Sequence, residues 1–149
     1  MESKATLRVV LDTNALLRSI SRKSAYKIIL DNLHENSYHL YITNDILLEY
    51  EEKITEFFSE ETAELIVGSF SLLNNVHKTD VHYNLQLIDS DPDDNKFVDC
   101  AFAANAHYIV SDDRHFNVLH TVQFPKINVI SLAHFKELVS NSTLLTSET

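Results

Sequence analysis

Short apolar runs alternate along the chain with longer segments in which apolar residues recur at helical spacing. Residues 6–11 (TLRVVL) form an apolar, β-branched run that ends abruptly at Asp12, which is typical of a buried parallel strand. Residues 14–32 follow with helical periodicity and a polar interruption around residues 21–24. The pattern therefore begins with a strand and a helix that is broken near its middle.

The next segments repeat this order. Residues 38–42 predict a second strand, and Thr43 or Asn44 can cap the helix that follows. Residues 61–73 predict a further helix. Residues 81–88 alternate only loosely, so we expect either an edge strand or an extended connection there.

In the second half of the chain a turn comes before the next repeat. Residues 91–95 (DPDDN) are a turn signal that leads into a helix over about residues 95–105. Short buried strands are then expected at residues 108–110 and 127–130. Strands that alternate with helices favour a parallel sheet covered on both faces.

These elements predict one α/β domain. With 149 residues the chain can bury a single ordinary core. We expect a three-layer α/β/α domain over residues 1–139 with a mostly parallel central sheet. Ser131 would cap its last helix, which would run through Val139, and residues 140–149 would form a polar, flexible tail.

Composition excludes several classes of protein. The sequence has no apolar stretch near the roughly 20 residues of a membrane helix, and we expect no signal peptide. Its only cysteine, Cys100, excludes an internal disulfide framework and indicates a reducing, cytoplasmic environment. Its only glycine, Gly68, excludes glycine-rich loops that bind phosphates or dinucleotides.

Acidic residues at four positions along the sequence are candidates for one functional site. The candidates are Asp12, Glu49, Asp94 with Asp99, and Asp113. Asp12 and Asp113 follow predicted strands, and sites in such sheets form outside the carboxyl ends of the strands. Because crowded carboxylates repel each other, a fold gathers them only to hold something cationic. The spacing therefore predicts a bound metal ion.

Neighbouring polar residues have simpler interpretations. We interpret Asp91 and Asp93 as turn residues and Asp112 as a solvated loop residue. The pair His115 and His120 lacks the i,i+4 spacing of a helical zinc pair, so ordinary surface or packing roles are expected.

Several segments together resemble a PIN domain. They are VVLDTNALL, ITNDILLEYEE and DPDDNKFVDCAFAANAHYIVSDDRHF, and the resemblance extends from about Arg8 to Val139. The sequence is most similar to bacterial PIN proteins described as VapC-like toxins. That resemblance implies a metal-dependent ribonuclease whose carboxylates hold Mg²⁺ or Mn²⁺.

The resemblance also implies a role for each acid. By position, Asp12, Glu49 and Asp94 match the first three family acids, Asp113 matches the last, and Asp99 is a further acid on the same helix as Asp94. We expect Asp12, Asp94 and Asp113 to anchor a first ion. Glu49 and Asp99 would orient water or help to hold a second ion. Carboxylates suit this task because Mg²⁺ prefers oxygen ligands.

RNA binding would need a local basic patch, because the net charge of the chain is −10. Arg22 and Lys23 lie near the predicted helix break, and Lys96 follows the third acid, so all three are candidate RNA contacts. Asn14 lies where the family often has a small polar residue near the metal.

The sequence also predicts protein partners and leaves one alternative function open. The resemblance implies an antitoxin protein encoded beside a toxin, and a homodimer that could use the apolar face of the 61–73 helix. A phosphatase of the haloacid-dehalogenase type also places Asp after its first strand, but it needs D-x-D, and here Asn14 takes the place of the second Asp. A non-catalytic PIN scaffold that binds RNA or a protein stays open.

Overall fold

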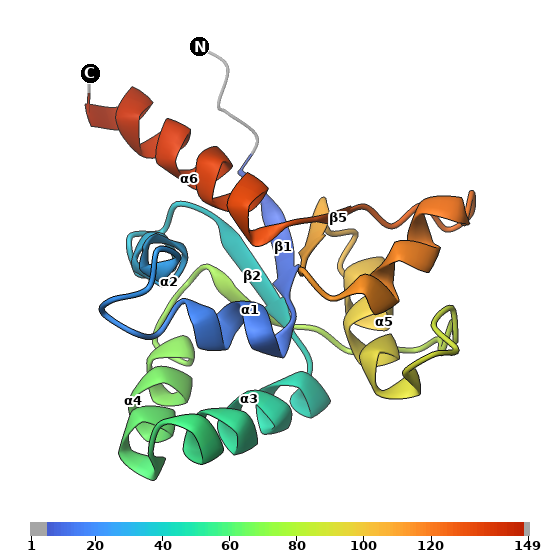
Figure 1. Cartoon of the computed structure of the whole chain (residues 1–149), viewed down its shortest axis with the longest axis horizontal. Helices are drawn as coiled ribbons and strands as arrows, with labels where there is room; N and C mark the ends of the chain where they lie inside the picture. Colours follow the sequence, from blue (N-terminus) through green and yellow to red (C-terminus); the bar gives the residue numbers. More distant parts are fainter. Residues whose placement is uncertain (1–5, 148–149) are drawn as a thin grey trace.

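A parallel β-sheet runs through the centre of the fold (Figure 1). The computed structural model describes residues 6–147, and side chains as far as residue 141. Its strands are β1 (Arg8–Leu11), β2 (His39–Ile42), β3 (Val76–Lys78), β4 (Tyr108–Val110) and β5 (Val129–Ile130). Within the described residues the order is β3-β2-β1-β4-β5, and every neighbouring pair is parallel. The predicted α/β fold with a parallel sheet is confirmed.

Helices connect the strands and flank the sheet. They are α1 (Thr13–Arg18), α2 (Lys27–His34), α3 (Asn44–Phe57), α4 (Glu60–Phe70), α5 (Asn95–Ala103) and α6 (Leu132–Ser147), with 3₁₀ helices η1 (Pro92–Asp94) and η2 (Arg114–Thr121). Helix α5 contacts β1, β2 and β4, whereas α2 packs against α6 and α3 against α4 (Figure 1). No helix in the described part of the chain is long and apolar enough to cross a membrane.

Local sequence explains where several helices begin and end. Thr43 caps α3 as predicted, because its Oγ1 accepts a hydrogen bond from the backbone N–H of Ile46 at 3.2 Å. The predicted break over residues 21–24 separates α1 from α2. Asn36 and Asn105 follow α2 and α5 with φ angles of 63° and 51°. Asparagine tolerates this left-handed conformation, so it can end helices in a chain with almost no glycine.

Two segments differ from expectation, and the structure decides between two alternatives for a third. Strand β3 was not predicted, because its segment, VHK, is short and mostly polar. Residues 81–88 form a connection and no strand, which is the second of the two predicted alternatives. Helix α6 continues to Ser147, beyond the expected end at Val139. The last two residues of the predicted tail lie outside the described residues.

The core lies between the sheet and its helices. Val9, Val10 and Leu11 of β1 are completely buried, as expected for the central strand of a sheet covered on both faces. Tyr38 packs edge-on against Phe135 of α6, with ring centroids 4.9 Å apart, and its hydroxyl donates to a backbone carbonyl of α2 at 2.7 Å. These contacts fix α2 and α6 against the sheet.

Strand register brings two chain segments together at the carboxyl edge of the sheet. Leu11 pairs with Val110, so the residues that follow them, Asp12 and Ser111, leave the sheet side by side. The backbone N–H of Asp12 donates to the carbonyl of Val110 at 3.2 Å. The ends of the central strands β1 and β4 therefore bring the segments that carry Asp12 and Asp113 to the same edge of the sheet.

Candidate metal centre

Asp12 is a buried carboxylate held by two hydrogen bonds. Only 4% of the residue is exposed. Its Oδ1 caps α1 by accepting from the N–H of Ala15 at 2.7 Å, and its Oδ2 accepts from the hydroxyl of Ser111. The pKa of Asp12 is raised to about 6, chiefly by burial; the hydrogen bonds from Ser111 and Ala15 act to lower this pKa, and the charges of Asp113 and Asp94 act to raise it.

Asp113 is joined to Asp12 through Ser111. The Ser111 hydroxyl that donates to Asp12 also accepts from the N–H of Asp113 at 2.9 Å. Oδ1 of Asp113 caps η2 by accepting from the N–H of His115 at 2.9 Å. Ser111 thus links the Asp12 side chain, which follows β1, to the backbone of Asp113, which caps η2.

The His115 side chain lies close to both Asp113 and Asp94. Its Nδ1 lies 3.3 Å from Oδ2 of Asp94, 3.3 Å from Oδ1 of Asp113 and 3.8 Å from Oδ2 of Asp91. Burial, followed by the charges of Asp91 and Asp113, raises the pKa of Asp94 to about 6. We call Asp12, Asp91, Asp94, Asp113 and His115 the acidic cluster.

The acidic cluster has the donors that a divalent cation requires. Asp91, Asp94 and His115 each offer one ligand atom, and these atoms lie within 4.8 Å of one another. Carboxylate oxygens suit Mg²⁺ and Mn²⁺, whereas an imidazole nitrogen favours a transition metal. The unfavourable charge at Asp12 and Asp94, expressed in their raised pKa values, is what a bound cation would relieve.

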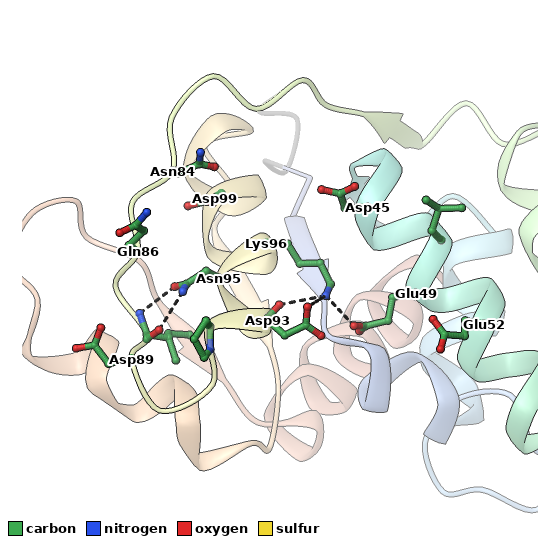
Figure 2. Close-up of a pocket in the computed structure, with 13 residues that line it drawn as sticks. Asp45, Glu49, Glu52, Asn84, Gln86, Asp89, Asp93, Asn95, Lys96 and Asp99 are labelled. Carbon is green, nitrogen blue, oxygen red and sulfur yellow. Dashed lines mark hydrogen bonds and ion pairs between the residues drawn. The ribbon is translucent and has the colours of Figure 1, made fainter.

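Glu49 lies beside the acidic cluster but has partners of its own. Its Oε2 accepts from the Thr13 hydroxyl, and its Oε1 lies 2.7 Å from Nζ of Lys96. Lys96 also contacts Oδ1 of Asp93 at 3.0 Å (Figure 2). The predicted second acid is therefore paired with a protein cation.

Asp99 faces a different cavity from Asp12 and Asp113. Its Oδ1 accepts from the N–H of Leu85 at 3.0 Å, and burial raises the pKa of its carboxyl group. It lines a cavity of about 670 Å³ between α3, α5 and the connection at residues 81–91, together with Glu49 and Lys96 (Figure 2). Asp12 and Asp113 line a separate cavity of about 290 Å³. Asp12 is linked to Asp113 through Ser111, and Asp113 to Asp94 through His115, but among the described residues only Asp91, Asp94 and His115 have ligand atoms within 4.8 Å of one another. Asp99 is held against a loop.

The sequence of the chain matches the PIN domain family over residues 8–115. The chain belongs to the PIN domain family. This membership favours the PIN interpretation over a haloacid-dehalogenase phosphatase. No curated relative matches the sequence of this PIN domain.

Solved structures with a similar fold include three from different bacteria. Salmonella typhimurium VapBC bound to DNA is 20% identical, with a TM-score of 0.58 over 85% of this chain and 99% of that one. Rickettsia felis VapBC2, bound to a promoter DNA fragment, is 18% identical, with a TM-score of 0.58 over 84% and 98% of the two chains. Mycobacterium tuberculosis VapC20, described as a toxin that cleaves the sarcin–ricin loop, is 12% identical, with a TM-score of 0.55 over 73% and 92%. At these identities the likeness concerns the fold.

Three of the four predicted RNA contacts are exposed, and the fourth is largely enclosed. Asn14 is exposed and lines the same cavity as Asp12 and Asp113. Arg22 and Lys23 are exposed in the turn between α1 and α2. Lys96, in contrast, is largely enclosed by its acidic partners.

Asp112 has a structural role that the sequence did not indicate. Its Oδ1 accepts from the N–H of Leu132 at the start of α6 at 3.1 Å, and its Oδ2 pairs with Arg18 at 2.9 Å. Its side chain is 41% exposed and it lies in a loop, as predicted. Asp112 thus helps to fix α6 and α1 beside the acidic cluster.

Asp91 and His115 are cluster members that the sequence interpretation missed. The turn role of Asp91 is present, since its Oδ1 accepts from the N–H of Asp93 at 3.2 Å, but its other oxygen faces His115. The spacing of zinc pairs did not indicate His115, because a mixed carboxylate and histidine site does not follow that spacing. The sequence offered one indication that His115 lies near the site, because it is only two residues after Asp113.

Proposed function

We propose that this PIN domain is a metal-dependent endoribonuclease that hydrolyses RNA phosphodiester bonds, with Mg²⁺ or Mn²⁺ as its cofactor. The observation that carries the proposal is the acidic cluster of a PIN domain, in which Asp91, Asp94 and His115 have ligand atoms within 4.8 Å of one another and Asp113 and Asp12 are linked to them through His115 and Ser111. Two of these carboxylates have pKa values of about 6, so each gains when a cation is bound nearby.

In this proposal Asp12, Asp94 and Asp113 hold the ion, and His115 adds a nitrogen ligand. A bound divalent ion supplies a Lewis acid for the phosphodiester and makes water easier to deprotonate. Ser111 and the N–H of Ala15 keep the Asp12 carboxylate in a fixed orientation, which reduces the cost of ordering it around an ion. The contact of Asp99 with Leu85 gives no support for a metal-binding role of Asp99.

RNA as the substrate is supported by the fold neighbours and by the rim of the site. VapC20 is described as a toxin that cleaves the sarcin–ricin loop, and its fold is similar to that of this chain. We propose Asn14, Arg22 and Lys23 as contacts to the RNA backbone. Arg22 and Lys23 are exposed, as residues that bind phosphates must be.

We further propose that the protein is the toxin of a toxin–antitoxin pair and acts in the cytoplasm. The similar VapBC structures support a protein partner. Large apolar side chains are exposed at the end of α3 and on α4, with Phe57 at 64% and Leu65 at 74%, and these are suited to a protein contact. The same surface is available for a homodimer.

The test is cleavage of labelled single-stranded RNA with Mg²⁺, Mn²⁺ or EDTA by the wild type, Asp12→Asn and a control variant, Asp31→Asn. Asp31 is an exposed acid on α2 that pairs with Lys27. We expect metal-dependent cutting by the wild type and Asp31→Asn alone. Equal cutting by Asp12→Asn would contradict the proposal, and absence of both cutting and metal binding in the wild type would favour the non-catalytic scaffold.

A further inference from the structure

Lys96 is an enclosed cation whose hydrogen bonds are all directed at acceptors of the protein. Its Nζ lies 2.7 Å from Oε1 of Glu49, 3.0 Å from Oδ1 of Asp93 and 3.1 Å from the backbone carbonyl of Asp93. An ammonium group has three N–H donors, so these acceptors match its full capacity. Using Lys96 to bind an RNA phosphate would require it to give up one of them.

The Lys96–Glu49 pair is unlike the ordinary surface pairs of this chain. Its side chains are only 16% and 18% exposed, whereas those of Lys53 and Glu56 in α3 are 39% and 55% exposed. Exposed pairs contribute little because water screens them, and enclosure strengthens the mutual attraction of the charges. Figure 2 shows the Lys96 side chain extending from α5 between Asp93 and Glu49.

Glu49 is also connected to the acidic cluster. Its second oxygen accepts from the hydroxyl of Thr13, the residue next to Asp12. Lys96 therefore places a positive charge against the carboxylate of Glu49, whose other oxygen is held by Thr13. A divalent ion bound to Glu49 would have to lie beside this ammonium group and would be repelled by it.

We propose that the Lys96 ammonium group takes the place of a second divalent ion, so that this PIN domain binds one ion. This inference rests on the proposed metal-dependent function and specifies its stoichiometry. Glu49 is then a positioning residue, which holds Lys96 and Thr13, and it is not a metal ligand. The single ion belongs to the acidic cluster.

The experiment counts bound Mn²⁺ by electron paramagnetic resonance, in which free and bound Mn²⁺ give different signals. The full-length wild type is compared with Lys96→Met, Lys96→Gln, Lys96→Arg and the matched control Lys53→Met. We expect one Mn²⁺ per chain for the wild type, Lys96→Arg and Lys53→Met. Lys96→Met and Lys96→Gln, which free the carboxylate of Glu49, should bind a second Mn²⁺.

The outcomes separate this inference from the function on which it rests. Two ions in the wild type, or one ion in both folded Lys96→Met and Lys96→Gln, would overturn the role of Lys96 and leave the metal-dependent function standing. No ion in the wild type would overturn both. Circular dichroism shows whether each variant is folded, and the one-ion result for Lys96→Arg separates loss of charge from loss of structure.

Discussion

The chain has two neighbouring acidic regions with different means of balancing charge. In the acidic cluster, Asp12 and Asp94 have pKa values raised to about 6, and Nδ1 of His115 lies 3.3 Å from Oδ2 of Asp94. In the larger cavity, which we call the Lys96 groove, Glu49 is paired with Lys96, and Asp99 accepts a backbone hydrogen bond. The number of carboxylates therefore does not identify a metal site. The two regions differ in that Glu49 is paired with a lysine of the protein, whereas the carboxyl groups of Asp12 and Asp94 have raised pKa values.

The largest difference should appear between Asp94→Asn and Asp99→Asn. Asp94 is assigned to the ion, so its replacement should slow metal-dependent RNA cleavage about 10³-fold, which corresponds to about 4 kcal/mol. Asp99→Asn keeps an oxygen that can accept from Leu85 and should change the rate by less than about threefold. Single-turnover cleavage at saturating Mn²⁺ measures both rates. Equal losses would remove the distinction between the two regions.

Asp12→Asn should stabilise the metal-free protein at neutral and higher pH. The folded-state pKa of Asp12, about 6, is above its ordinary value of 3.8, so the folded state holds this proton more tightly than the unfolded state does. Stability from this group is present below its ordinary pKa and is lost as pH rises through about 6. Removing the charge should therefore add up to about 3 kcal/mol near pH 8 and almost nothing near pH 4.

Urea unfolding in EDTA at both pH values measures this effect. Asp45→Asn on α3 provides a control, because Asp45 is exposed at the edge of the Lys96 groove. A destabilised Asp12→Asn protein at high pH would mean that the buried charge is balanced within the protein. The acidic cluster would then resemble the Lys96 groove.

His115→Ala should change which metal the protein prefers. Loss of the nitrogen ligand should weaken Mn²⁺ binding about tenfold and Mg²⁺ binding less, because imidazole suits transition metals better than Mg²⁺. Isothermal titration calorimetry with each metal tests this, and His120→Ala, which changes an exposed histidine of the same 3₁₀ helix, is the matched control. Equal losses for both metals would indicate that His115 acts only by orienting Asp94 and Asp113.

The smallest effect is expected outside both regions, at Arg22 and Lys23. The double change to Glu should weaken RNA binding severalfold and reduce its salt dependence by about one unit of slope for each phosphate that the variant no longer neutralises. Fluorescence anisotropy with labelled RNA over a range of salt concentrations measures this. Lys126→Glu, at another exposed lysine, is the control. An unchanged slope would remove these residues from the RNA-binding surface.

The sheet was predictable because its central strands are apolar runs with abrupt ends. The apolar segments TLRVVL, before Asp12, and YIV, before Ser111, predict β1 and β4. Because the two strands are parallel, their carboxyl ends lie at the same edge of the sheet. Strand β3 was not predictable in the same way, because His77 and Lys78 break the apolar pattern. Residues 81–88 have some alternation but no strand partner, and Asp99 and Asn95 hold the segment through their side chains.

The positions of several site residues differ from the sequence prediction for physical reasons. Asp99 is five residues after Asp94, which is about 140° around a helix and therefore on another face. That separation could have been read from the spacing. The pairing of Glu49 with Lys96 could not, because it joins two helices far apart in the sequence and depends on their packing. His115 joins the acidic cluster because η2 turns its ring back toward Asp94.

Anomalous diffraction from crystals soaked in Mn²⁺ would test the central claim most directly. The account predicts one strong peak about 2.0–2.3 Å from carboxylate oxygens of Asp12, Asp94 or Asp113, no peak beside Glu49, and loss of the peak in Asp12→Asn crystals. A peak in the Lys96 groove alone, or an identical peak in Asp12→Asn crystals, would contradict it.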